Sequence, residues 1–163
     1  MWLAQSKSAP RTACDTLVRA MERTSEHVPA TLPARIELAG SGTASVATAA
    51  GRALGEALRG LLEGDGVAGY GMAIMPADEA LANVVLEASG RPLLVSNVDL
   101  SDAHVAGLER DLVSGFLREL AEAAGLTMHV RLLHGEDAGH VLDAIFKALG
   151  GALANAAAPS RKE

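Results

Sequence analysis

Two side chains near the C-terminal end of the chain have types and spacing suited to metal chemistry. His140 and Asp143 lie three residues apart in AGHVLDAIFKAL. We predict a helix there, so the two side chains should share one helix face. An imidazole and a carboxylate are suitable ligands for a divalent first-row metal. The alternative is that both are satisfied by ordinary hydrogen bonds.

Two cationic side chains are of types that suit an anion. Arg91 lies in the predicted turn SGRP, and Lys147 lies on the same predicted helix as His140. A guanidinium and an ammonium group supply charge-assisted donors to a phosphate. The alternative is that both are simply solvated.

No arrangement of residues for nucleophilic catalysis is visible. The only cysteine, Cys14, lies in a predicted helix without a nearby histidine. Three further histidines are isolated among polar neighbours, so we expect them on the surface: His27, His104 and His134.

An internal repeat organises the chain. The segment AAGRALGEAL at 49–58 lies 95 positions before AIFKALGGAL at 144–153, and six of the ten residues are identical. We therefore expect one domain, 1–163, with repeat halves at about 12–65 and 105–155 joined by a β-rich segment at 66–104. Coincidence between two alanine-rich helices is the alternative.

Hydrophobic spacing predicts the elements of the second half. DLVSGFLREL has helical spacing and Gly125 should end that helix, whereas LTMHVRLL alternates as a strand does. In the central segment, 84–86 and 93–95 are β-rich runs around the turn SGRP, which favours a meander or hairpin. Each half would then be a sheet with two helices.

Composition excludes several classes of protein. The hydrophobic fraction is 49%, aromatics are 2% and the net charge is −6, without a basic stripe that would favour nucleic acid. The single cysteine fits a reducing compartment. MWLAQSKSAPR lacks the apolar run of a signal peptide, and no stretch is long enough to span a membrane. We expect a cytoplasmic protein.

Three blocks resemble the imidazoleglycerol-phosphate dehydratase family: MPADEALANVVLEASGRPLLVSNVDL, ELAEAAGLTMHV and HVLDAIFKALGGAL. The resemblance covers about residues 12–162 and is strongest over 70–153. It implies an α+β fold of the ribosomal protein S5 domain 2-like type. That fold is a tandem duplication of a sheet-plus-two-helices unit, with the helices packed between two sheets. The resemblance also implies homo-oligomers and a carbon–oxygen lyase (hydro-lyase) of histidine biosynthesis.

Family members bind two manganese ions between subunits through an HHxxE motif and a further histidine in each half. In the second half, the resemblance places this motif on Gly139, His140 and Asp143, and the further histidine on His129. The surviving donors could hold a single metal ion, or they could be remnants with ordinary hydrogen bonds.

In the first half, the motif falls on Ala44, Ser45 and Thr48, and the further histidine aligns with Thr16. The repeat offset independently pairs His140 with Ser45. Since these residues offer no usual manganese ligand, we expect no cofactor, although manganese is the cofactor of the family. The first ten residues also lack the alternation of the family's opening strand, which carries an acidic catalytic residue.

The substrate-binding residues are better kept. The resemblance assigns phosphate binding to Arg91, to Lys147 in FKAL, and to Ser160 and Lys162 in PSRKE. A further family arginine is replaced by Gly69. We therefore expect a phosphorylated small molecule as ligand.

The acidic pair Asp78–Glu79 matches the catalytic acids of the family, in which the equivalent of Asp78 lies near the reacting imidazole. Without metal, a carboxylate faces a carbon acid too weak for it. The sequence therefore favours a divergent homologue with impaired or lost dehydration, such as a pseudoenzyme or a binding or assembly subunit that could co-assemble with a complete paralogue. The alternatives are an active dehydratase or related lyase on a phosphorylated small molecule, and an unrelated enzyme on the same fold.

Overall fold

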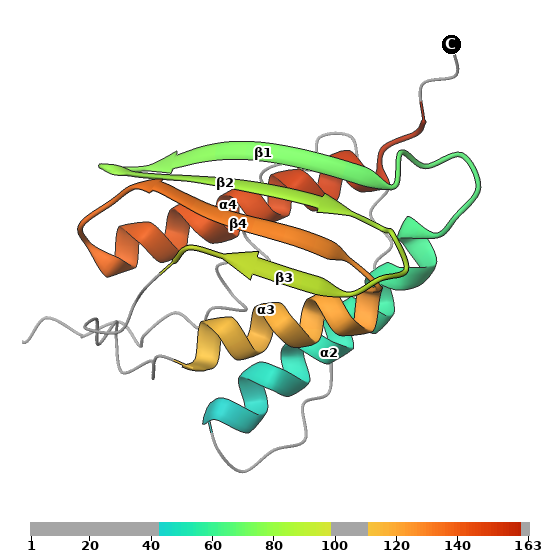
Figure 1. Cartoon of the computed structure of the whole chain (residues 1–163), viewed down its shortest axis with the longest axis horizontal. Helices are drawn as coiled ribbons and strands as arrows, with labels where there is room; N and C mark the ends of the chain where they lie inside the picture. The colour runs from blue at the N-terminus through green and yellow to red at the C-terminus, as the bar shows by residue number, and fades with distance from the viewer. Residues whose placement is uncertain (1–42, 99–110, 161–163) are drawn as a thin grey trace, which may run out of the picture.

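The computed structural model describes residues 43–98 and 111–160 (Figure 1). Within these ranges the chain forms three helices and four strands. In order they are α2 (Thr43–Leu62), β1 (Tyr70–Ala77), β2 (Ala80–Glu87), β3 (Leu93–Ser96), α3 (Asp111–Ala124), β4 (Thr127–His134) and α4 (Ala138–Ala157). The described part is therefore α+β, as the sequence predicts.

The four strands form one mixed sheet in the order β1-β2-β4-β3. β1 and β2 are an antiparallel hairpin in which Ala77 pairs with Ala80. β2 is antiparallel to β4, and β4 is parallel to β3. A parallel pair needs a crossover connection, and α3 lies on the connection between β3 and β4.

This order corrects the prediction of a meander or hairpin across the turn SGRP. The two β-rich runs are strands β2 and β3, but β4 separates them in the sheet. The hairpin partner of β2 is instead β1, which the sequence reading did not identify as a strand. Local patterning finds strands, whereas their order depends on the crossover that packs α3 beneath β3.

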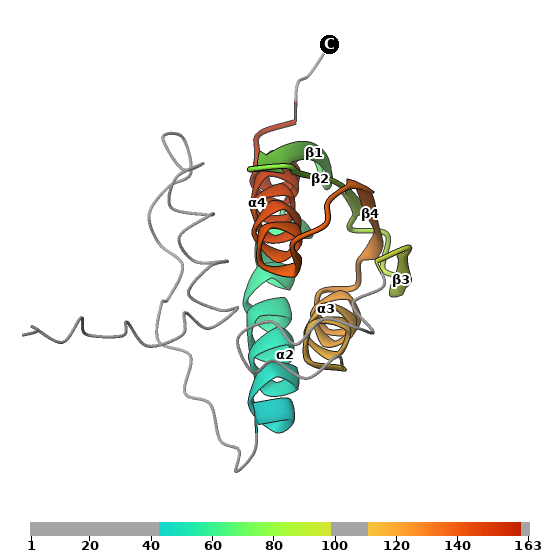
Figure 2. The same cartoon turned by 90° about the vertical axis from the view of Figure 1, so that its left-hand side faces the viewer.

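The helices lie on one side of the sheet (Figure 2). α4 packs on β1 and β2, α3 contacts β3, and α2 packs chiefly on α3. The only two phenylalanines of the chain, Phe116 of α3 and Phe146 of α4, meet edge to face with ring centroids 5.8 Å apart. Small residues fill much of the remaining core, so backbones approach closely.

Several local predictions are confirmed. α3 and β4 form where the spacing predicts them, and Gly125 follows α3 with a φ of 68°. α2 and α4 each have 20 residues and begin at Thr43 and Ala138, which agrees with the repeat offset. Most of the rest of the first half lies outside the described residues, so the duplication and its second sheet stay predictions.

A helix that could span a membrane is not found in 43–98 and 111–160.

The contact between β1 and α4 gives a test of the packing. A Cβ at Gly71 would overlap the carbonyl oxygen of Ala152, whereas a Cβ at Gly60 meets nothing within 4 Å. We expect Gly71→Ala to lower the free energy of unfolding by about 1–3 kcal/mol through overpacking. Gly60→Ala, on an exposed part of α2, should raise it by about 0.5–1 kcal/mol. Urea denaturation measures both, and a neutral Gly71→Ala would contradict this packing.

Candidate active site

The turn between β1 and β2 brings the predicted acidic pair to one end of the sheet. Asp78 and Glu79 lie between the paired residues Ala77 and Ala80. Asp78 has a φ of 48°, a left-handed conformation that aspartate tolerates better than most residues. β4 ends at the same end of the sheet and leads into α4 (Figure 1). The hairpin turn therefore meets the N-terminal end of α4.

Glu79 connects this turn to the start of α4. Its Oε1 accepts hydrogen bonds from the backbone N–H groups of Asp137, at 2.9 Å, and Glu136, at 3.3 Å. Its Oε2 lies 2.5 Å from Nδ1 of His140. Both carboxylate oxygens are thus engaged, and they join residues that are far apart in the sequence.

The imidazole of His140 lies between the two acids. Nδ1 faces Glu79, while Nε2 lies 3.4 Å from Oδ2 of Asp78. The His140 side chain is 41% exposed and that of Asp78 is 76% exposed, so the cluster is open to solvent. We call Asp78, Glu79 and His140 the acid–imidazole cluster.

Sequence reasoning missed the residue that starts α4. Asp137 is its N-cap, and Oδ1 of Asp137 accepts hydrogen bonds from the backbone N–H groups of Gly139, at 2.8 Å, and His140, at 3.1 Å. An aspartate directly before a predicted helix is a recognised signal for such a cap. The cap fixes the backbone from which the His140 side chain projects.

The hydrogen bonds shift two titrations in opposite directions. The backbone N–H of Asp137, and then His140, lower the pKa of Glu79 from 4.5 to about 2. The hydrogen bond to Glu79, with the charges of Glu79 and Asp78, raises the pKa of His140 above 6.5. Both shifts favour an ionised carboxylate beside a protonated imidazole.

The other predicted residues of α4 lie further along the helix. Lys147 Nζ donates to the backbone carbonyl of Pro76 at 3.4 Å, at the edge of β1. Asp143 is exposed on the helix surface. The Lys147 ammonium therefore lies toward the same end of β1 as the acid–imidazole cluster.

His129 is on the other side of the sheet. Its neighbours in β4, Met128 and Val130, are fully buried, so His129 points away from the helices. It is paired with Val85, an exposed residue of β2. Within one chain, His129 cannot converge on a metal with His140 and Asp143.

The described donors of one chain do not fit the pair of manganese ions that the family resemblance implies. Glu79 engages Nδ1 of His140, so Nε2 is the one nitrogen of that ring left as a possible metal ligand. In residues 43–98 and 111–160, no three histidine, cysteine, aspartate or glutamate side chains converge as metal ligands would. Thr48, at a motif position of the first half, packs its methyl group toward Gly115. We therefore derive no step through a metal.

The predicted phosphate-binding residues Arg91 and Ser160 lie at the opposite end of the sheet. Arg91 is exposed in the turn after β2, where its carbonyl accepts a hydrogen bond from Oγ1 of Thr127 at 2.9 Å. The N–H of Ser160 donates to the carbonyl of Gly66, in the loop before β1. Lys162 lies outside the described residues.

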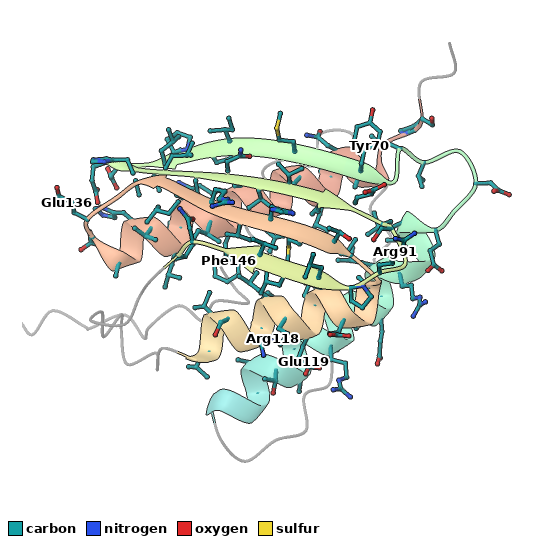
Figure 3. All side chains as sticks on the ribbon, viewed as in Figure 1. Tyr70, Arg91, Arg118, Glu119, Glu136 and Phe146 are labelled. Atoms are coloured by element: carbon teal, nitrogen blue, oxygen red, sulfur yellow. The ribbon has the colours of Figure 1, made fainter. Side chains whose placement is uncertain are left out.

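The length of β1 separates the two groups. Tyr70 pairs with Glu87 near the turn that carries Arg91, while Ala77 pairs with Ala80 beside the acidic pair. Eight strand residues span about 25 Å. Figure 3 shows the same separation, with Glu136 labelled at one end and Arg91 at the other. One small ligand cannot touch both ends of a single chain.

The sheet with its helices on one side resembles solved structures of known proteins, and the chain also matches a known family in sequence. The sequence pattern of the family "Imidazoleglycerol-phosphate dehydratase" matches residues 40–153. The chain belongs to the imidazoleglycerol-phosphate dehydratase family.

Relatives and solved structures agree with this assignment. The imidazoleglycerol-phosphate dehydratase of Moorella thermoacetica is 45% identical over 108 residues, which are 65% of this chain and 55% of the relative. The chain thus spans about half the length of the curated relatives it matches. The crystal structure of the Staphylococcus aureus enzyme has a TM-score of 0.70 at 34% identity, covering 75% of this chain and 72% of that chain. The Pyrococcus furiosus structure has a TM-score of 0.75 at 30% identity, covering 92% and 81%.

The opposed pKa shifts predict how the cluster stabilises the protein. Because its pKa is lowered, Glu79 contributes to the free energy of unfolding. This contribution is fully present above pH 4.5 and is lost as the pH falls toward about 2. Because its pKa is raised, His140 also contributes to the free energy of unfolding. This contribution is fully present below pH 6.5 and is lost as the pH rises through the raised pKa. The cluster should therefore contribute most between pH 4.5 and 6.5.

We expect Glu79→Gln to lower the free energy of unfolding more at about pH 5.5 than at about pH 9. Denaturation at both pH values measures this difference. Asn155→Ala is the control, because Asn155 donates an uncharged hydrogen bond to the carbonyl of Met72. Asn155→Ala should lower the free energy of unfolding by the same amount at both pH values. If Glu79→Gln also lowered it equally at both, the ion pair would be contradicted.

Proposed function

We propose that this protein is an imidazoleglycerol-phosphate dehydratase homologue that binds an imidazole-bearing phosphate ester, with impaired metal-dependent dehydration. The observation that carries the proposal is the acid–imidazole cluster. It keeps the catalytic acids assigned by the family resemblance beside His140, while both oxygens of Glu79 and Nδ1 of His140 are occupied by each other or by backbone. Together with the replaced first-half donors, this combination supports a binding or assembly role.

Impaired dehydration is supported by the chemistry of the donors. The first-half motif positions hold Ala44, Ser45 and Thr48, none of which is a usual ligand for manganese. The family reaction removes an unactivated C–H proton, for which metal ions supply most of the charge stabilisation. A solvent-exposed carboxylate such as Asp78 is a weak base for that task.

We further propose that the ligand binds between copies of the chain. The acid–imidazole cluster and Arg91 are separated by about 25 Å, so the phosphate and the imidazole of one ligand would need different chains. The outer face of the sheet supports self-association, because it exposes Tyr70, Met72, Ile74, Val85 and Leu133, with exposures of 41–69%.

An active dehydratase of histidine biosynthesis is the second candidate. The family match and the 45% identity to the Moorella thermoacetica enzyme favour it. In that case His129 and His140, which cannot converge within one chain, would meet at a metal ion between copies of the chain. The discriminating quantity is the metal content together with turnover.

Metal content and turnover therefore test the proposal. We expect fewer than about two manganese ions per chain after purification with manganese. With imidazoleglycerol phosphate, kcat/KM should be more than about 100-fold below that of the Moorella thermoacetica enzyme measured alongside, because losing even an outer-shell partner of a metal costs roughly 10–100-fold. Elemental analysis and a dehydration assay give both numbers. Two ions per chain with normal turnover would establish the active dehydratase instead.

Mixing two defective variants tests binding between copies. Asp78→Asn and Arg91→Ala should each abolish binding of imidazoleglycerol phosphate. When the two are co-expressed, about a quarter of the sites should combine an intact Asp78 with an intact Arg91 from a different chain. Calorimetry measures this stoichiometry, and the double variant expressed alone is the control. Binding that does not return on mixing would show that both residues must be supplied by one chain, or that one of them does not bind the ligand.

A further inference from the structure

Glu79 is held too firmly to act as a mobile base. Oε1 accepts two backbone hydrogen bonds, from Glu136 and Asp137, and Oε2 faces Nδ1 of His140 at 2.5 Å. An ionised carboxylate accepts hydrogen bonds and donates none. Its oxygens are therefore already committed to groups of the same chain before a ligand arrives.

The contact with Glu79 determines which nitrogen of His140 carries a hydrogen. Because Oε2 can only accept, Nδ1 must be the donor in this pair. The backbone of His140 is fixed independently, since its N–H donates to Oδ1 of Asp137 at 3.1 Å. The ring is thus held both through its side chain and through the start of α4.

Nε2 is the ring nitrogen that Glu79 does not engage. It lies 3.4 Å from Oδ2 of Asp78, longer than a strong charge-assisted hydrogen bond. The Asp78 side chain is also far more exposed than that of Glu79, at 76% against 36%. A ligand that approaches the cluster therefore meets Asp78 and Nε2, and Glu79 lies behind the ring.

We infer that Glu79 is a positioning residue rather than a catalytic one: it fixes the Nδ1–H form of His140, so that Nε2, together with Asp78, is presented to the ligand. The role of Nε2 toward an imidazole-bearing phosphate ester rests on the proposed function. The fixed tautomer does not, because it follows from contacts within the chain.

Nitrogen NMR of the histidine ring tests this directly. We expect ¹⁵N-labelled protein, at a pH where the ring of His140 is neutral, to show the Nδ1–H tautomer, with the signal assigned by its loss in His140→Gln. Glu79→Gln should lose this preference and give a mixture of both tautomers. Asp78→Asn is the matched control, because it removes the other carboxylate beside the same ring and should leave the tautomer unchanged.

Each outcome has a distinct meaning. An Nε2–H tautomer in the wild-type protein overturns the inference, even if Glu79→Gln fails to fold, and so does a tautomer that Glu79→Gln leaves unchanged. Addition of imidazoleglycerol phosphate should shift the Nε2 resonance more than that of Nδ1. A larger shift at Nδ1 would contradict the claim that Nε2 faces the ligand. If the Nδ1–H tautomer depends on Glu79 but the ligand shifts neither nitrogen, the positioning role stands and the proposed function fails.

Discussion

The carboxylate of Glu79 joins the β1–β2 turn to the start of α4, and the geometry of the candidate site depends on this connection. Glu79 accepts hydrogen bonds from the backbone N–H groups of Glu136 and Asp137, which lie 57 and 58 residues later in the chain. Two such hydrogen bonds keep the carboxylate ionised, and an ionised carboxylate in turn holds the imidazole of His140. The close packing of α4 on β1, which Gly71 permits, brings the two segments within reach.

Electrostatics explain why an imidazole can occupy this position. Asp78 and Glu79 are neighbouring carboxylates at a tight turn, and such a pair is stabilised by a nearby positive charge. The family resemblance implies metal cations in this region, whereas here the imidazole of His140, with its raised pKa, lies between the two acids. In this chain, the raised pKa of His140 therefore favours a positive charge of the protein's own beside the two acids. That is consistent with keeping the fold while most of the predicted metal ligands are replaced.

Sequence patterning predicted the elements better than their arrangement. The helical spacing around Phe116 and the alternation around Met128 are local signals, and both elements form. The insertion of β4 between β2 and β3 depends on a crossover, which no local pattern encodes. β1 was missed because its outward residues, such as Met72 and Ile74, are apolar and hide the usual alternation.

The candidate site shows the same limit. Family resemblance identified Asp78, Glu79 and His140 as separate candidates, but their mutual contacts depend on how the hairpin turn packs against α4. The separation of Arg91 from this cluster likewise follows from the direction of β1 and β2, which spacing along the sequence does not reveal.

A crystal structure of the purified protein grown with manganese would test the central claim most directly. We expect the Glu79 carboxylate to remain bonded to the backbone N–H of Asp137 and to Nδ1 of His140. If Glu79 instead turned away from His140 and both side chains coordinated manganese, the connection between turn and helix would not be the basis of this site.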